Sequence, residues 1–293
     1  MTRSGHWLIL AAAVLWGTTG TAQAFVPEGA RPVEVGAVRL AIGGAALLSF
    51  SMVRGEFRDR RQLPLVPTAL AAAGVAFYQL CFFAAVATTG VAVGTLVVIG
   101  SSPILAGILS YLLRGEKPER KWFVATALAV LGSFLMLSGD GLSTLNSGGF
   151  LLALGAGLSY AVFSLASKAL LDDWPPDAAM ALVFGLGGLA LIPVILSSDL
   201  IWLSGIRGWL VALHLGLLAT FLAYILFARG LKNTPVSTAV SLSLLEPLTA
   251  AILGVVMLRE PVTLLSILGM MIVIAGIAWL SLGRNSIRIA MAD

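Results

Sequence analysis

The sequence has little charge and almost no cysteine. Only 11% of its 293 residues are Asp, Glu, Lys or Arg, whereas a soluble globular protein carries about 25% of them. Charge this sparse cannot coat a soluble surface, and 59% of the residues are hydrophobic. The single cysteine, Cys81, can form no intrachain disulfide. The composition therefore indicates an integral membrane protein.

Motifs of enzymes and of nucleic-acid binding are also missing. The sequence contains no H-E-x-x-H, no Walker A loop, no well-placed G-x-G-x-x-G and no G-x-S-x-G elbow. Two histidines and one cysteine cannot make a zinc site or a Cys-His pair. The net charge of +4 comes from short basic blocks between apolar runs, which argues against a nucleic-acid partner. We expect no enzymatic activity, no metal and no cofactor.

Long apolar runs fill most of the chain. A helix needs about 20 apolar residues to cross ~30 Å of hydrocarbon. This length predicts an all-α membrane protein with ten transmembrane helices. The ten predicted spans are 5–25, 33–53, 65–88, 91–113, 120–138, 148–169, 178–197, 207–229, 235–257 and 263–282.

Lys and Arg are distributed unevenly between the connections of these spans. With the N-terminus inside, fourteen fall in inside segments, three (Arg31, Arg207 and Arg259) fall outside, and Arg39 falls within a span. Cytoplasmic loops of membrane proteins carry the excess of Lys and Arg. Both termini are therefore predicted to be cytoplasmic.

The sequence matches itself at an offset of 144 residues. Coinciding residues include Pro103 with Pro247, Glu116 with Glu260, and Gly43-Gly44 with Gly187-Gly188. We predict two five-helix repeats, 1–143 and 144–293. Because five is odd, the second repeat would be inverted, an architecture of secondary transporters that places the substrate at the midplane. The start of the chain also resembles a cleavable signal that ends at Ala22-Gln23-Ala24, but the repeat favours an uncleaved helix.

Several motifs at matched depths identify a family. They are Trp16-Gly17, Arg39-Leu40, and the paired segments Ser102-Pro103 to Gly115-Glu116 and Glu246-Pro247 to Arg259-Glu260. On these motifs the chain resembles the drug/metabolite transporter superfamily, specifically its ten-helix EamA-type carriers. Within it, the chain is most similar to the YddG-like bacterial exporters of aromatic and other neutral amino acids. The resemblance implies export of a small metabolite across the bacterial inner membrane by alternating access.

Pro103 and Pro247 lie near the middles of the fourth and ninth predicted spans. Each proline removes one backbone hydrogen bond and should free one carbonyl, that of Ile99 or Ser243. Irregular backbone at membrane depth must face protein or a water-filled cavity. We predict that the two prolines, with Ser102 beside the first, line or hinge a pathway. A simple packing kink is the alternative.

Among the ionisable side chains of the predicted spans, Glu246, Arg39 and His214 are the candidates for function. Glu246 is the sharpest signal, because a charge at the bilayer centre costs about 2.5–3.5 kcal/mol on insertion scales. It could recognise a substrate ammonium, exchange a proton, or only brace the break at Pro247. Its repeat partner, Ser102, is uncharged, so the fold does not require a charge at this position, and this favours a functional role. Arg39 could bind a substrate carboxylate, or its side chain could extend to place the guanidinium at the membrane interface. His214 could titrate or merely pack.

Aromatic and polar side chains also occur deep inside the predicted spans. Trp and Tyr normally collect at membrane interfaces, so these positions predict a cavity wall or packing between helices. The predicted substrate-binding set is Trp16, Tyr78, Gln79, Phe83, Tyr160, Tyr224, Ser243 and Glu246. By contrast, Trp122, Trp202 and Trp209 lie at span ends and are expected to be interfacial anchors.

The sequence thus predicts a secondary transporter of aromatic or other neutral amino acids, acting as a monomer or weak dimer in the lipid bilayer. A nucleobase, a polyamine or a sugar derivative is the alternative cargo. A scaffold or an intramembrane enzyme would leave the inverted symmetry and the paired prolines without a purpose.

Overall fold

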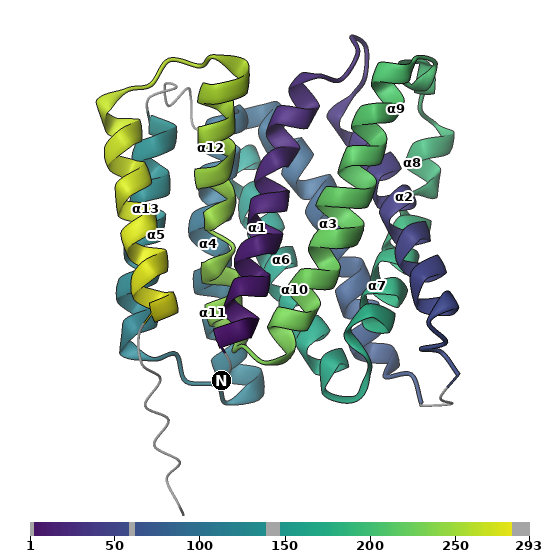
Figure 1. Cartoon of the computed structure of the whole chain (residues 1–293), viewed down its shortest axis with the longest axis horizontal. Coiled ribbons are helices and arrows are strands. Elements are labelled where there is room, and N and C mark those ends of the chain that lie inside the picture. Colours follow the sequence, from purple (N-terminus) through teal and green to yellow (C-terminus); the bar gives the residue numbers. More distant parts are fainter. Residues whose placement is uncertain (1–2, 59–61, 139–146, 283–293) are drawn as a thin grey trace, which may run out of the picture.

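The computed structural model describes residues 3–58, 62–138 and 147–282. These residues form a bundle of roughly parallel helices, with no strand among them (Figure 1). The predicted repeat boundary between 143 and 144 lies outside the described residues, as do four of the basic residues in the orientation count. Those four are Arg60, Arg61, Arg284 and Arg288.

Each of the first five predicted spans forms one helix. The helices are α1 (Arg3–Ala24), α2 (Pro32–Val53), α3 (Leu65–Thr89), α4 (Val91–Arg114) and α5 (Arg120–Ser138). Pro32 is the first residue of α2. A backbone N–H at this position has no hydrogen-bond partner within the helix, so proline removes no helical hydrogen bond there. Gly90 alone separates α3 from α4, with φ of 83°, a conformation that other residues rarely adopt.

The later spans are more often interrupted. Their helices are α6 (Ser147–Asp173), α7 (Pro176–Ala190) with α8 (Ile192–Leu196), α9 (Ile206–Leu213) with η2 (His214–Leu222) and α10 (Ala223–Lys232), α11 (Val236–Leu242) with α12 (Leu245–Leu258), and α13 (Leu264–Leu282). A short 3₁₀ turn, η1 (Leu200–Leu203), follows α8. The η2 segment is a π-helix, a form that is rare and frequently found at functional sites.

Seven helical segments of the described chain are long and apolar enough to cross a membrane. The remaining predicted spans, 5–25, 120–138 and 178–197, correspond to helices outside that set. In the last of them, α7 contains 15 residues. The chain is therefore an all-helical membrane protein, and the count of ten spans stays a prediction.

The most extensive helix packing joins early helices to late ones. Helix α3 packs on α6, α5 on α13, α4 on α6, α2 on α7, and α1 on α12 and α10. Figure 1 shows α5 and α13 side by side at one edge. The bundle core thus lies between the two predicted repeats rather than inside either one.

Glycines allow these helices to approach closely. A Cβ added to Gly44 would lie 2.7 Å from the carbonyl oxygen of Phe184, and one added to Gly188 would lie 3.5 Å from that of Leu40. At the offset of 144, Gly44 corresponds to Gly188 and Leu40 corresponds to Phe184. The two contacts are therefore equivalent, with the glycine on α2 in one and on α7 in the other. Small residues of this kind let membrane helices pack backbone to backbone.

Helices α4 and α12 end in the same way. The residues after them, Gly115 and Arg259, both adopt left-handed conformations, with φ of 67° and 58°. The backbone N–H groups of Glu116 and Glu260 then bond to the carbonyl six residues earlier, at 3.3 and 3.2 Å. These bonds satisfy carbonyls that a helix end leaves open.

The α5–α13 contact gives a test of this packing. A Cβ added to Gly132 would lie 2.6 Å from the carbonyl oxygen of Gly269, whereas one added to Gly20 would meet no atom within 4 Å. We expect Gly132→Ala to destabilise the protein by about 1–3 kcal/mol, as overpacking does. Gly20→Ala should be neutral or stabilising. The measurement is the thermal unfolding midpoint in detergent, and equal midpoints for both variants would contradict the close approach.

Candidate functional site

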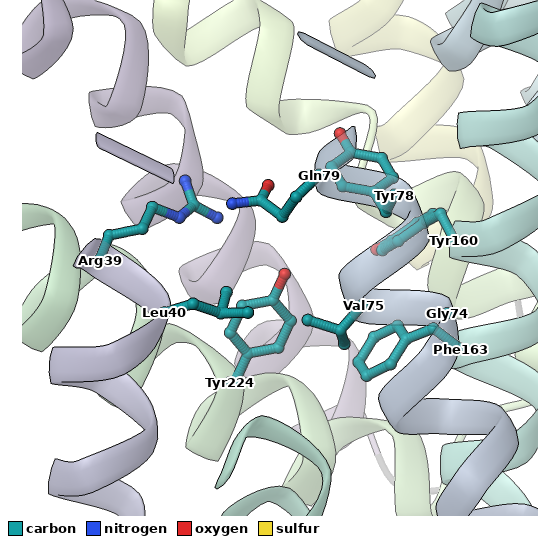
Figure 2. A pocket seen from close by; sticks show the side chains of 9 residues that line it. All are labelled: Arg39, Leu40, Gly74, Val75, Tyr78, Gln79, Tyr160, Phe163 and Tyr224. Carbon is teal, nitrogen blue, oxygen red and sulfur yellow. The ribbon is translucent and has the colours of Figure 1, made fainter. Parts of the chain in front are cut away.

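A cavity lies between α2, α3, α6 and α10 (Figure 2). Five of the sequence-predicted site residues line it. The complete lining is Arg39, Leu40, Gly74, Val75, Tyr78, Gln79, Tyr160, Phe163 and Tyr224. Side chains from distant parts of the sequence thus converge on one space.

Aromatic rings form a continuous wall of this cavity. The ring centroids of Tyr78 and Tyr160 are 6.0 Å apart, and those of Tyr160 and Phe163 are also 6.0 Å apart. The ring centroids of Phe163 and Tyr224 are 5.8 Å apart. The hydroxyls of Tyr160 and Tyr224 point toward the middle of the space in Figure 2. Such a wall offers flat apolar faces together with polar tips.

Trp16 supports the wall from behind. It is 5% exposed and is not a lining residue. Its ring lies 4.9 Å from that of Tyr224, 5.3 Å from Phe227 and 6.5 Å from Tyr160. Trp16 therefore holds the tyrosines in place rather than facing the cavity.

Arg39 brings a positive charge to the opposite side of the cavity. Its guanidinium extends toward the amide of Gln79 in Figure 2, and that amide donates to the carbonyl of Gly36 at 3.2 Å. No ion pair of Arg39 occurs among the described residues, and its buried Nε has no hydrogen-bond partner there. Donors of this group are left for a ligand.

Glu246 brings a negative charge to the same region. It is the second residue of α12, and its N–H donates to the carbonyl of Ser243, whose hydroxyl pairs with that of the lining residue Tyr160. Within the described chain, Glu246 and Arg39 are not paired within 4.0 Å. A carboxyl group and a guanidinium therefore lie near one cavity without pairing directly.

The helix break of the ninth predicted span lies beside this region. Helix α11 ends at Leu242 and α12 begins at Leu245, so the break precedes Pro247 by several residues. The expectation that the Ser243 carbonyl is left free was wrong, because it accepts the N–H of Glu246 at 2.9 Å. The Ser243 hydroxyl also pairs with that of Tyr160 at 3.1 Å, which ties the break to the aromatic wall.

The first proline behaves differently from the second. Helix α4 continues through Pro103, and the hydroxyl of Ser102 donates to the carbonyl of Val98 at 2.6 Å. A serine that bonds back to its own helix often bends it. The two prolines are therefore not structurally equivalent, although they coincide in the repeat.

Two further predicted residues lie outside the cavity lining. His214 begins η2, and its Nε2 pairs with the hydroxyl of Thr18 at 2.8 Å. Phe83 packs on Phe82, with ring centres 5.5 Å apart, and lies against Gly36. Neither residue joins the tyrosines.

Four lining residues were absent from the predicted set. Phe163 lies three positions after Tyr160, and Gly74 and Val75 lie four and three positions before Tyr78. Residues at these spacings share a helix face. Helical spacing from the predicted tyrosines would therefore have found them, while Leu40 simply follows Arg39.

The expected interfacial tryptophans are partly internal. Trp122 is 5% exposed and Trp202 is 3% exposed, so their assignment as anchors was wrong. The indole N–H of Trp122 donates to the carbonyl of Ser237 at 3.0 Å, which gives it a buried partner. Trp209 is 47% exposed, as an anchor should be.

Ionic contacts tie the helices together at one end of the bundle. Arg114 at the end of α4 pairs with Asp172 of α6 at 3.1 Å, and Arg229 of α10 pairs with Asp177 of α7 at 2.6 Å. Buried Lys168 donates to three backbone carbonyls around the end of α10, at 2.7, 2.8 and 3.1 Å. Of these contacts, the pair of Arg114 with Asp172 joins the two predicted repeats, and the others stabilise the second repeat at this end.

Comparison with known proteins points to one family. The family model described as "EamA-like transporter family" matches residues 3–138 and again residues 147–282. The chain is 43% identical to the uncharacterized transporter YwfM of Bacillus subtilis, over 93% of this chain and 92% of that protein. It is 27% identical to the threonine/homoserine exporter RhtA of Escherichia coli, over 92% of this chain and 88% of that protein.

A solved crystal structure is similar in fold. It superimposes with a TM-score of 0.84 and 22% sequence identity, covering 96% of this chain and 98% of its own. At this identity the similarity concerns the fold alone.

The role of Trp16 can be tested against a second tryptophan of the same helix. We expect Trp16→Ala to destabilise the protein by about 3–5 kcal/mol, because it empties a packed site behind the tyrosines. Trp7 is 61% exposed, so Trp7→Ala should change stability little. Thermal unfolding followed by circular dichroism in detergent measures both. If Trp16→Ala unfolded no earlier than Trp7→Ala, the supporting role would be wrong.

Proposed function

Because the chain belongs to the EamA-like transporter family, we propose that it is a secondary transporter that exports neutral amino acids, aromatic ones included, by alternating access. The chain encodes no nucleotide-binding loop, so the driving force is a solute or ion gradient. The observation that carries the proposal is that Arg39 lines a cavity whose wall residue Tyr160 is hydrogen-bonded to Ser243, the residue that accepts the N–H of Glu246.

A neutral amino acid matches this charge arrangement. Its carboxylate would accept hydrogen bonds from Arg39, and its ammonium would approach Glu246. A bidentate guanidinium–carboxylate pair is strong and directional. A polyamine has no group for Arg39, so this arrangement disfavours a polyamine as cargo.

The side chain of the substrate would lie against the aromatic wall. Tyr78, Tyr160 and Tyr224 offer faces for apolar or planar groups. The exporter of threonine and homoserine among the relatives supports an amino-acid cargo. Because the wall is aromatic, we extend the proposed range to phenylalanine and tryptophan.

An inverted repeat of ten spans, 1–143 and 144–293, remains part of the proposal. It is supported by the exchanged glycine contacts, by the matching ends of α4 and α12, and by the family model matching twice. Two similar halves make inward-open and outward-open states close in energy. Export would require the ionic contact of Arg114 with Asp172 to separate, since it joins the two repeats at the end proposed to face the cytoplasm.

Uptake into proteoliposomes tests the charge arrangement. We expect saturable uptake of labelled phenylalanine and threonine, inhibited by neutral amino acids but not by phenethylamine or phenylpropionate, each of which lacks one charge. Glu246→Gln and Arg39→Gln should each reduce uptake at least about tenfold, because a charged hydrogen bond is worth ~1.5–3 kcal/mol.

The control for these variants is Glu28→Gln, which changes an exposed carboxylate in the link between α1 and α2. It should transport like the unmodified protein. Wild-type uptake by Glu246→Gln would assign this carboxylate to bracing the helix break, and saturable uptake of no amino acid would defeat the proposed cargo.

The aromatic wall predicts a selective defect. Tyr78→Ala should weaken the uptake of phenylalanine about 2- to 10-fold more than that of threonine, because ring pairing contributes ~0.5–1.5 kcal/mol. The neighbouring Phe77 is 59% exposed, so Phe77→Ala is the matched control and should leave the ratio unchanged. Competition assays in proteoliposomes give the ratio. An equal loss for both substrates would indicate a folding defect instead of a lost contact.

A further inference from the structure

A second cavity lies at the end of the bundle where α1 begins and α13 ends. Figure 1 shows these two helix ends at the same end of the bundle. The cavity shares no lining residue with the Arg39 cavity. Its walls come from the start of α1, the link into α5 with the first turn of α5, the start of α11 and the end of α13. Its polar lining includes His6, Lys117, Lys121, Ser237 and Thr238.

His6 is the buried polar side chain of this cavity. It is 7% exposed, and neither ring nitrogen makes a hydrogen bond of good geometry within the described chain, although the backbone of Ser281 lies near. Buried polar groups nearly always have a partner, and one without a partner costs free energy. A ligand in the cavity would supply that partner.

The charge of the lining favours an anion. Lys117 makes no ion pair among the described residues, while Lys121 lies 3.6 Å from Glu119. Helix α5 begins at Arg120, and Lys121 and Trp122 of its first turn line the cavity, so the positive end of the helix dipole lies at the wall. Two ammonium groups outweigh the single carboxylate of the lining.

The wall is held in shape without a ligand. The indole N–H of Trp122 donates to the carbonyl of Ser237 at 3.0 Å, and the hydroxyls of Thr126 and Ser241 pair at 2.8 Å. These bonds tie α5 to α11. The donors of the cavity are therefore held ready, which lowers the cost of binding.

The fold does not require charged residues here. At the offset of 144, the position of His6 is taken by Phe150, those of Lys117 and Lys121 by Pro261 and Leu265, and that of Thr238 by Gly94. Glu119 and Trp122 correspond to Thr263 and Ser266, so the equivalent place in the other half keeps hydroxyl groups but has no charge and no histidine at these positions. Charged groups in one half alone indicate a role beyond packing.

We infer that this cavity binds a phosphate group. Lys117 and Lys121 pair with its oxygens, and the imidazole of His6 donates a hydrogen bond to one of them, while the hydroxyls of Ser237 and Thr238 add donors. The cavity lies at the bundle end proposed to face the cytoplasm, where basic pockets between helices meet anionic lipid headgroups. The phosphate can belong to such a lipid or to a soluble anion.

Thermal unfolding of the full-length protein, purified in neutral detergent and stripped of lipid, tests the inference. One arm titrates inorganic phosphate against chloride at equal ionic strength, and the other adds phosphatidylglycerol against phosphatidylcholine. Because a ligand that binds only the folded state stabilises it, the unfolding midpoint should rise. A rise with the lipid alone, with phosphate alone, or with both identifies the source and supports the site.

Two variants make the test specific. In His6→Phe and Lys117→Gln, the ligand concentration that gives half of the rise should increase about tenfold or more. Lys232→Gln removes an exposed charge that is not part of the lining, and it should behave like the unmodified protein. If neither source raises the midpoint, or if Lys117→Gln responds like Lys232→Gln, the site is overturned. Lys117 lies outside the helices, so its variant keeps the test valid if His6→Phe fails to fold.

Discussion

The backbone within the hydrocarbon must satisfy its own polar groups, and this constraint shapes the rest of the structure. It explains why every spanning segment that the structure describes is helical. At the break between α11 and α12, the carbonyl of Ser243 accepts the N–H of Glu246, and the hydroxyl of Ser243 meets Tyr160. The break thus remains satisfied, and it directs Glu246 toward the region of the cavity.

Lipid tails are as apolar as leucine, so burial of apolar side chains cannot hold membrane helices together as it does in water. Close backbone approach and a few internal polar bonds do this instead. Gly44 and Gly188 bring α2 and α7 together, and Lys168 caps carbonyls near the end of α10. Because the most extensive contacts run between early and late helices, a rocking motion of the halves would change these surfaces while each helix stays intact.

Sequence reasoning located the helices well, since run length and the positions of Pro and Gly depend only on local chemistry. It also brought Tyr78, Tyr160 and Tyr224 into one set, because tyrosines usually lie at the membrane interface and these three lie deep within their spans. It missed the π-helix at His214 and placed the break at Pro247 instead of before Glu246. Both features depend on packing against other helices. Runs that are apolar on all sides carry no periodicity that shows which face is inside.

Two ionisable side chains, Arg39 and Glu246, lie near the first cavity without pairing with each other. Each charge near the first cavity carries a desolvation cost, and that cost is not recovered by direct pairing of Arg39 with Glu246. A bracing role alone would favour a close pair, because an isolated buried charge is less stable than a paired one. In the proposed transport cycle, the separation of Arg39 from Glu246 leaves room for a group that enters between them and leaves again. A permanent ion pair would stabilise the bundle more, but it would close the space that the proposed substrate would occupy.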